Sequence, residues 1–450
     1  MSDKFIARPY QIEDLATLIN APRTGLFHDP GGGKTYIAAM FTQYIHDSTK
    51  ERIVWTQPGG IAAKNRYDIL FATNFQPEEV ALVQGSKDQR VKIMNDPRVK
   101  VFLMSGVGYA NEWELLPSDV RHSFHDEIHL YYTTHGPNRT QEWYNACRKK
   151  GAVVPMTGTV IRGRLDSAYP ILHVLGPMFY GSDRNFIQHH AWFDENGKVI
   201  GWKNHERLSE VLKHVGIFRS FKSIYGQEKK VVQVQRCVVT PKVWKMYERI
   251  EAAALIELTD SFVDAQNPAV GAMRARQLLA CPEMFEIDER SGKDEALLVD
   301  IEDHLKTGER LAIFSSFTME QNRIVNIIKK LGGRVGHING TVSNEKRQEV
   351  DRQFNANELQ FVVASPATAG IGFNWAFLNT MIFVSIDYTD DSVVQAYRRG
   401  IRGTREQPIL LKFLKYEDTI EDRIFQIVDR KSRDHHLVNE NLDELGLSKL

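Results

Sequence analysis

The feature that most constrains the fold is a glycine-rich loop placed between a short apolar run and a helical pattern. The loop, residues 28–35, reads His-Asp-Pro-Gly-Gly-Gly-Lys-Thr. It ends the apolar run Thr24–His28 and opens the helical pattern Lys34–Tyr44. Glycines let backbone N–H groups curl around a polyphosphate, because no Cβ blocks the close approach. A strand, a glycine-rich loop and a helix in this order predict a phosphate-binding site at the start of the helix.

The candidate ligands of a nucleotide and its magnesium ion in this loop are Gly31, Gly32, Gly33, Lys34 and Thr35. Lys34 would reach the β- and γ-phosphates, and the Thr35 hydroxyl would bind Mg²⁺. The strict form of the pattern begins with glycine, whereas this chain has His28 at that position. The alternative interpretation is an ordinary glycine-rich turn with a lysine at the start of the helix.

Short apolar runs alternate with amphipathic helical patterns in two separate parts of the chain. The clearest candidate strands after the loop are Arg52–Thr56, Val99–Met104, Ala152–Met156, Phe361–Ala364, Thr380–Ile386 and Ile409–Leu414. Strands that alternate with helices form parallel sheets covered on both faces. We therefore predict an α/β fold with two tandem parallel-sheet lobes, residues 1–235 and 236–450.

The span 177–308 differs from both alternating parts. It begins with an aromatic-rich stretch in which Asn196-Gly197, a typical hairpin turn, lies between Trp192 and Trp202. Long helical patterns follow, so we predict a mostly helical insertion between the core motifs. We interpret its aromatic residues as the core of an inserted subdomain, with a stacking surface for bases as the alternative. These residues are Phe179, Tyr180, Phe186, Trp192, Phe193 and Trp202.

A second candidate site is the acidic pair Asp126-Glu127, which is followed by Ile128 and His129. Hydrolysis of a phosphoanhydride needs one carboxylate to hold Mg²⁺ and a second acid to position and polarise the attacking water. Asp126 is the candidate metal ligand and Glu127 the candidate catalytic residue. Adjacent acids are more often solvated surface, and residues 121–125 are unusually polar for a buried strand, so the pair alone does not identify a site.

Charge excludes some classes of protein and leaves others open. Lys plus Arg and Asp plus Glu both number 57, and this balance excludes a uniformly basic nucleic-acid coat protein and an acidic solvating tail. Locally, residues 213–245 hold eight Lys or Arg against Glu228, and residues 395–415 hold six against Glu406. Each stretch fits either sequence-independent phosphate contact or a solvated basic face.

The termini, hydropathy and cysteines set the expected compartment. The N-terminus lacks the apolar core of a signal peptide, and no apolar run approaches the length of a membrane span. Cys147, Cys237 and Cys281 lie far apart in the sequence, so they suggest neither a disulfide framework nor a zinc site. We expect a protein of the reducing cytoplasm.

The order of the motifs resembles superfamily 2 helicases, and most closely the Snf2-type DNA translocases. Besides the loop and the acidic pair, the matching segments are Arg8-Pro9-Tyr10-Gln11, Gln57-Pro58, Thr157–Asp166, Lys229–Val239, Arg276–Glu283, Ser291-Gly292-Lys293, Ile313–Phe317, Ile338-Asn339-Gly340, Ser365–Asn374, Gln395–Gly403 and Asp418–Ile424. Two positions depart from the family pattern: Val160 replaces a proline and Ala369 replaces a glycine. The resemblance runs from Arg8 to about Lys431 and implies that both lobes are RecA-like.

The resemblance also implies nucleotide-binding roles for residues outside the loop. Arg8 and Gln11 would recognise the adenine. Arg399 and Arg402 would reach the γ-phosphate from the second lobe, where the permanent charge of arginine stabilises the transferring phosphoryl group. If one helix runs through Gln395, Arg399 and Arg402, their spacing places them on one face.

Other residues are expected to link the nucleotide to the nucleic acid or to the solvent. By resemblance, the coupling residues are Thr157, Thr159, Gly370, Gly372 and Gln395. The two glycines are equally consistent with ordinary turns. We interpret Arg398 as a solvent-facing or DNA-backbone charge.

These expectations describe an ATP- and Mg²⁺-dependent DNA motor that remodels forked or branched duplex. A compact chain of this type is similar to phage and bacterial fork-remodelling helicases, which implies branch migration, fork regression, recombination or repair, in the host cytoplasm for a tailed phage. Two alternatives stay open: an RNA helicase, and an ATP-binding scaffold that clamps nucleic acid without turnover.

Overall fold

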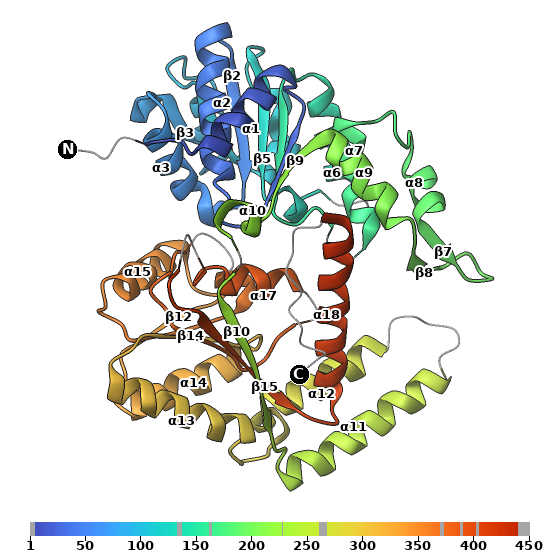
Figure 1. Cartoon of the computed structure of the whole chain (residues 1–450), viewed down its shortest axis with the longest axis vertical. Coiled ribbons are helices and arrows are strands. Elements are labelled where there is room, and N and C mark those ends of the chain that lie inside the picture. Colours follow the sequence, from blue (N-terminus) through green and yellow to red (C-terminus); the bar gives the residue numbers. More distant parts are fainter. Residues whose placement is uncertain are drawn as a thin grey trace. The chain divides into compact units, whose positions relative to one another are not determined.

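The computed structural model describes residues 5–132, 137–161, 164–226, 228–260, 268–369, 373–387, 390–401 and 405–439. Up to Ser432, the chain divides between Gln227 and Glu228 into two compact units, each built on a parallel sheet (Figure 1). This confirms the predicted α/β architecture. We expected the second lobe to start at residue 236, whereas the division lies earlier because Lys230–Cys237 forms a strand of the second sheet.

The sheet of the first unit consists of parallel strands in the described part of the chain. Their bounds are β1 (Gly25–His28), β2 (Arg52–Gln57), β3 (Val80–Leu82), β4 (Val101–Ser105), β5 (Val120–Asp126), β6 (Val153–Met156) and β9 (Gly216–Arg219). The order is β3-β4-β2-β5-β6-β1-β9. The neighbours β5, β6 and β1 therefore end side by side, and these ends carry the acidic pair, Thr157 and the glycine-rich loop.

Helices cover both faces of this sheet. They are α1 (Pro9–Asn20), α2 (Lys34–Thr49), α3 (Ala62–Ala72), α4 (Lys87–Met94), α5 (Gly106–Glu112), α6 (Pro137–Arg148), α7 (Tyr169–Leu175), α8 (Asp183–His190), α9 (His205–Val215) and α10 (Phe221–Tyr225). Successive residues of β2 point to opposite faces, so Ile53 and Trp55 join one apolar cluster while Val54 joins the other.

The strand β5 is buried although its sequence is polar. The ring of His125 is fully enclosed, and its two nitrogens lie 2.9 Å from Thr56 Oγ1 and 3.2 Å from Trp143 Nε1, which donates to it. Burial lowers the pKa of His125 to about 3, so the ring is neutral at pH 7. A polar side chain such as His125 can occupy the centre of the sheet because it is neutral and hydrogen-bonded.

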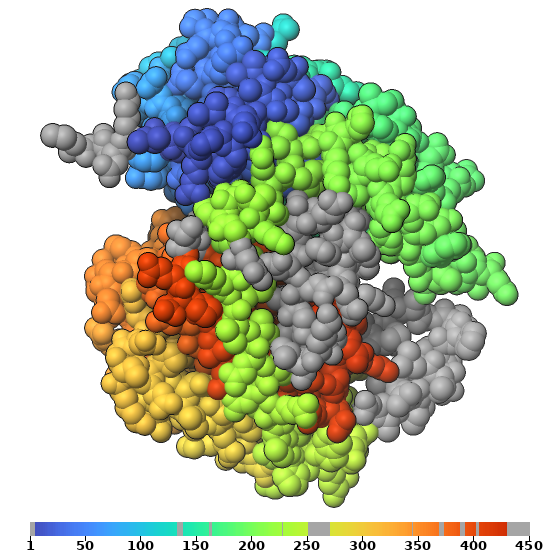
Figure 2. All heavy atoms as spheres, viewed as in Figure 1, coloured from blue at the N-terminus to red at the C-terminus, as the bar shows by residue number. Residues whose placement is uncertain are grey.

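The aromatic-rich insertion separates into a packed part and an exposed hairpin. The strands β7 (Ala191–Phe193) and β8 (Val199–Trp202) pair antiparallel around Gly197, whose φ is 77°, which confirms the predicted hairpin. Phe186 is fully buried, and Phe179, Tyr180 and Trp202 pack against the same core, as predicted. Trp192 and Phe193 are 56% and 41% exposed. The core interpretation is wrong for these two, because they lie on a two-stranded ribbon that extends from the subdomain (Figures 1 and 2).

The second unit repeats the parallel arrangement in its described residues. Its strands are β10 (Lys230–Cys237), β11 (Leu311–Phe314), β12 (Val335–Ile338), β13 (Phe361–Ala364), β14 (Thr380–Phe383) and β15 (Ile409–Tyr416), in the order β10-β15-β14-β11-β13-β12. Its helices are α11 (Pro241–Asp260), α12 (Pro268–Ala280), α13 (Gly292–Thr307), α14 (Thr318–Lys330), α15 (Asn344–Asn355), α16 (Pro366–Ala369), α17 (Asp390–Tyr397) and α18 (Ile420–Asn439). Over the described residues, every helix falls short of the length and apolarity that a membrane span requires.

Candidate functional site

The glycine-rich loop connects β1 to α2 and needs glycine at each of its three central positions. Gly31 and Gly33 have φ values of 88° and 70°, which L side chains rarely adopt. A Cβ on Gly32 would lie 2.9 Å from His28 Cβ, and one on Gly33 would lie 2.4 Å from Gln11 Nε2. The loop is therefore a backbone cradle of the kind that binds phosphate groups.

His28 stands at the first position of this loop without entering the cradle. Its Nδ1 lies 3.2 Å from the Gly32 carbonyl, and its Nε2 lies 3.3 Å from a carboxylate oxygen of Asp14 in α1. Burial, with a smaller contribution from Lys34, lowers the pKa of His28 to about 3. The chain tolerates histidine in place of glycine because the ring packs as a neutral group toward α1.

Lys34 begins α2 and is the buried cation of the loop. Its Nζ donates to the His28 carbonyl over 2.8 Å. Thr35 follows directly and is half-buried. A lysine held against the loop backbone can exchange this carbonyl for the oxygen of a bound phosphate at little conformational cost.

Two tyrosines hold the outer side of the loop. Tyr10 Oη donates to the Gly32 carbonyl over 3.3 Å, and Tyr225 Oη donates to the Gly31 carbonyl over 3.0 Å. Tyr225 belongs to α10, whose residue Phe221 donates its backbone N–H to Asp29 over 2.7 Å. We missed Tyr225 in the sequence because it lies far from the loop along the chain and carries no motif.

The predicted adenine-binding residues lie beside the loop. Gln11 is buried in the first turn of α1, where its Oε1 accepts the Arg8 backbone N–H over 2.9 Å. The Arg8 guanidinium lies 4.9 Å from the centre of the Tyr225 ring. Arg8, Gln11 and Tyr225 thus offer a cation, an amide and an aromatic face, which are groups suited to binding a base.

The acidic pair lies at the carboxyl end of β5. Asp126 is buried, and its Oδ2 accepts from Asn65 Nδ2 over 2.9 Å. Burial and the neighbouring Glu127 raise the pKa of Asp126 to about 6, while Asn65 and Lys34 oppose the rise. Glu127 has a φ of 48°, a strained value for a residue other than glycine. Asp126 and Thr35 offer the oxygen donors that Mg²⁺ takes, so both residues fit this ion.

A chain of polar contacts joins the acidic pair to the predicted coupling residues. Glu127 Oε2 lies 3.5 Å from His129 Nδ1, which lies 2.8 Å from Thr157 Oγ1. Thr157 Oγ1 also accepts the Thr159 backbone N–H over 2.9 Å. In the sequence, His129 is only the last residue of the segment Asp126–His129. In the structure, its ring lies between Glu127 and Thr157.

In the second unit, α17 ends earlier than the predicted arginine face requires. Gln395 is half-buried in α17, which ends at Tyr397. Arg399 lies in the following turn, is buried, and has its Nη1 3.5 Å from the Phe373 carbonyl. The turn is close-packed, because a Cβ on Gly400 would lie 2.5 Å from Ile409 Cδ1. Arg402, Gly370 and Gly372 lie outside the described residues.

Arg398 contradicts the role that we expected for it. Its side chain is buried, and its Nε donates to Glu228 Oε1 over 3.0 Å. It is therefore neither a solvent-facing charge nor exposed to a DNA backbone. Adjacent arginines can have such different environments because only the folded turn decides which way each one points.

Some cations of the two basic stretches are paired with acids, most of which lie elsewhere in the chain. The cation–acid pairs are Arg219–Asp14, Lys230–Glu228, Arg236–Glu417, Lys242–Glu289, Lys412–Asp300 and Lys415–Asp422. The stretch 213–245 is also divided between the two units. Acids brought close in the fold therefore offset part of the local excess of charge, while Lys213, Lys222, Lys229 and Lys245 are exposed.

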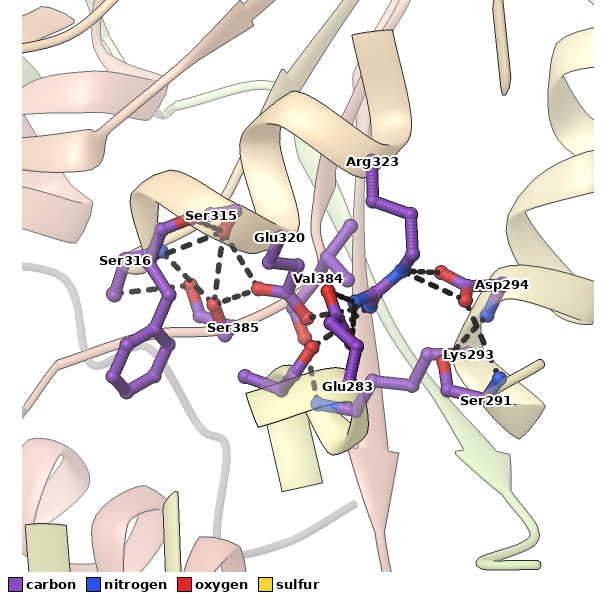
Figure 3. Close-up of polar contacts among 12 residues, drawn as sticks. Glu283, Ser291, Lys293, Asp294, Ser315, Ser316, Glu320, Arg323, Val384 and Ser385 are labelled. Carbon is purple, nitrogen blue, oxygen red and sulfur yellow. Dashed lines mark hydrogen bonds and ion pairs between the residues drawn. The ribbon is translucent and has the colours of Figure 1, made fainter. Parts of the chain in front are cut away.

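A polar network in the second unit unites four segments that we had matched only by resemblance (Figure 3). Lys293 Nζ donates to the Val384 carbonyl and to Glu421 Oε1, each over 2.6 Å. The network also links Ser315 and Ser385 to the buried Glu320, and Arg323 to Asp294 and Glu283. These contacts hold the ends of β11 and β14 against α13, α14 and the start of α18.

Comparisons with known proteins agree with this geometry. Residues 292–404 match the family described as helicase conserved C-terminal domain. The chain is 22% identical to the chromodomain-helicase-DNA-binding protein 1-like of Danio rerio over 95% of this chain and 43% of that protein. It is 25% identical to a SWI/SNF-related, matrix-associated, actin-dependent regulator of chromatin, subfamily A member 1, of Mus musculus, over 62% of this chain and 28% of that protein.

A solved structure shows the same fold. The helicase domain of Hef from Pyrococcus furiosus superposes with a TM-score of 0.59 at 15% identity, covering 93% of this chain and 97% of that one. The two units are therefore two tandem RecA-like lobes, as predicted. The chain spans less than half the length of the two curated relatives named above.

Proposed function

We propose that the chain is a member of the Snf2-type branch of the superfamily 2 helicases and an ATP- and Mg²⁺-dependent motor that moves along DNA. The observation that carries this proposal is the meeting of the glycine-rich loop, Asp126-Glu127 and Thr157 at three adjacent strand ends of one sheet. Phosphoanhydride hydrolysis requires this combination of a phosphate cradle, a metal-binding carboxylate and an acid for the water.

Each site residue of the first lobe has a distinct part in the proposed hydrolysis. Lys34 binds the β- and γ-phosphates, while Thr35 and Asp126 hold Mg²⁺, which neutralises phosphate charge when bound. Glu127 orients and polarises the attacking water. Arg8, Gln11 and Tyr225 bind the adenine. His129 connects Glu127 to Thr157 and so makes the site sensitive to the segment that follows β6.

The second lobe supplies arginine to the same reaction in this proposal. Arg399 and Arg402 stabilise the charge that develops on the transferring phosphoryl group. ATP favours a closed arrangement of the lobes, and hydrolysis releases it. Gly370, Gly372 and Gln395 pass this change to the DNA. Repeated closure and opening on a phosphate backbone yields directional movement by population shift.

We propose forked or branched duplex as the preferred substrate, as in branch migration, fork regression, recombination or repair. The name of the Danio rerio relative, a chromodomain-helicase-DNA-binding protein, supports DNA over RNA. The exposed Trp192 and Phe193 on the hairpin support a junction, because unpaired bases stack on exposed aromatic rings. Resemblance to compact phage and bacterial fork-remodelling helicases supports the same substrate and a cytoplasmic setting.

One ATPase titration tests this proposal and its alternatives. Turnover is measured with single-stranded DNA, duplex, forked duplex and RNA at equal nucleotide concentration. We expect the strongest stimulation by forked duplex and the weakest by RNA. Equal or stronger stimulation by RNA would identify an RNA helicase instead. ATP binding without turnover on every nucleic acid would identify a clamp.

A further inference from the structure

A buried charge cluster lies where the second unit begins. Glu228 is the first residue of that unit, and its side chain is 1% exposed, as is that of Arg398. Glu228 Oε1 accepts from Arg398 Nε over 3.0 Å, and Glu228 Oε2 accepts from Lys230 Nζ over 2.7 Å. Tyr397 Oη lies 3.4 Å from the second oxygen. One carboxylate therefore binds the end of α17 and the start of β10 together.

The carboxylate of Glu228 and its two cationic partners are ionised. Burial opposes ionisation of Glu228, but Arg398 and Lys230 outweigh it and hold the pKa of this carboxyl below its usual value. Burial also disfavours the charge of Lys230, yet Tyr397 and Glu228 raise its pKa above the usual value. Charges shielded from water attract each other more strongly than surface charges, and removal of one partner leaves the other buried without compensation.

The turn that follows α17 is held from two sides. Arg398 points to Glu228, whereas Arg399 Nη1 lies 3.5 Å from the Phe373 carbonyl. The Arg399 carbonyl accepts the Trp375 backbone N–H over 2.8 Å. On the other side of the cluster, Lys230 starts the β10–β15 ladder opposite Ile409. The position of Arg399 is thus set jointly by the segment around Phe373 and by the segment that enters the unit.

We propose that Glu228 is a positioning residue for ATP hydrolysis: through its ion pair with Arg398 it orients the turn that presents Arg399 to the nucleotide. This inference rests on the proposed function, in which Arg399 acts on the γ-phosphate. The segment that leads from the first lobe into the second is thereby tied to the catalytic arginine.

Loss of the Glu228 charge should affect turnover more than nucleotide binding. Without it, Arg398 is left buried beside Lys230, and the two positive charges repel each other. The turn then relaxes and Arg399 loses its fixed direction. Because Arg399 stabilises charge that develops in the transition state, the loss falls on kcat and leaves KM for ATP little changed.

The first test is Glu228→Gln, which keeps the shape of the side chain and removes its charge. We expect DNA-stimulated kcat to fall about tenfold or more, since a small misplacement of a catalytic group has effects of this size. KM for ATP and the affinity for ADP should stay within about twofold, as for loss of an interaction made only in the transition state. Thermal unfolding is measured on the same samples.

The matched control is Asp300→Asn, which breaks a partly buried ion pair of 2.7 Å between Asp300 and Lys412 in the same unit. We expect it to lower the unfolding temperature without lowering kcat. Equal loss of kcat in Asp300→Asn and Glu228→Gln would reduce Glu228 to a structural residue and overturn the proposal.

A second pair of variants covers the case in which Glu228→Gln fails to fold. Arg398→Lys retains the positive charge beside Glu228, whereas Arg398→Gln removes it. We expect Arg398→Lys to keep most of the turnover and Arg398→Gln to lose about as much as Glu228→Gln. Wild-type kcat in Arg398→Gln would refute the inference. Absence of ATP hydrolysis by the unsubstituted protein would refute the proposed function instead.

Discussion

The two lobes differ in the charge state of some of the polar side chains that they enclose. In the first lobe, His28 and His125 are enclosed as neutral rings whose pKa burial lowers to about 3. In the second lobe, the enclosed groups are ionised pairs, such as Glu228 with Arg398 and Lys293 with Glu421. The first lobe buries charged side chains as well, such as Lys34 and Asp14, so the contrast concerns its enclosed neutral histidines and the enclosed ion pairs of the second lobe.

This difference matches the chemistry proposed for each lobe. The first lobe concentrates Lys34, Asp126 and Glu127 at the ends of β1 and β5, where neutral histidines do not compete with them for the phosphate or the metal. The second lobe contributes arginine from a turn outside α17, and ion pairs hold that turn and the strand ends near it. Neutral packing preserves a charged site, whereas ion pairs fix the direction of an irregular segment.

The largest expected effect comes from removing the charges of the first lobe. Lys34→Ala and Glu127→Gln should each lower ATPase kcat by at least about 1,000-fold, because each removes a group that acts on the transferring phosphoryl or its attacking water. Steady-state ATP hydrolysis in saturating DNA measures this. Lys100→Ala, which breaks a surface pair with Glu79, is the control. Near-normal turnover in either variant would mean that the active site lies elsewhere.

The next effect concerns the stability of the second lobe. Lys293→Met should lower its free energy of unfolding by about 3 kcal/mol, because it leaves the Glu421 carboxylate without its buried cation. Urea unfolding followed by circular dichroism measures the loss. The double variant Lys293→Met with Glu421→Gln should recover part of it, since no uncompensated charge is left. If the double variant is as unstable as the sum of both single changes, the ion pair does not govern this region.

A smaller effect should appear in acid and in the first lobe. The folded-state pKa of His125, about 3, lies below its unfolded value, so its contribution to stability is complete above about pH 6.5 and falls as the pH drops toward 3. The expected slope is about 1.4 kcal/mol per pH unit for this histidine. Urea unfolding of His125→Gln between about pH 7 and pH 5 should show a slope reduced by this amount. An unchanged slope would mean that His125 is protonated inside the fold.

The smallest expected effect is in the hairpin, which shares neither strategy. Trp192→Ala should change the free energy of unfolding by less than about 0.5 kcal/mol, because the ring is more than half exposed. Phe186→Leu is the buried comparison and should cost about 1 kcal/mol or more. Thermal unfolding of both variants measures the two losses of stability. A large loss of stability in Trp192→Ala would mean that this side chain packs in the core, as the sequence predicts.

Much of the first lobe could be predicted from the sequence. The glycine-rich loop, Asp126-Glu127, and Thr157 with Thr159 follow strands that alternation and β-propensity reveal, and the structure brings them together at neighbouring strand ends. Sequence reasoning was weaker for β5, because the pairing that makes its polar residues compatible with burial involves distant residues such as Trp143.

The environments of individual residues in the second lobe were harder to predict from the sequence. The spacing of Gln395, Arg399 and Arg402 suggested one helical face, but α17 ends at Tyr397 because close packing at Gly400 turns the chain against β15. The counter-charges of the basic stretches lie up to two hundred residues away, as Arg219 and Asp14 illustrate. Counting charges within a short stretch of sequence does not reveal partners that lie far along the chain.

The two α/β lobes and the motifs of the first lobe follow from the order of residues, because strand–loop–helix motifs are local and glycine, lysine and threonine act at adjacent positions. The partners of these motifs come from tertiary packing: Tyr225 on the loop, His129 between Glu127 and Thr157, and Glu228 on Arg398. Hydrogen bonds and ion pairs act over about 3 Å in space. Their partners are set by how strands and helices pack, and the order of residues alone does not contain that distance.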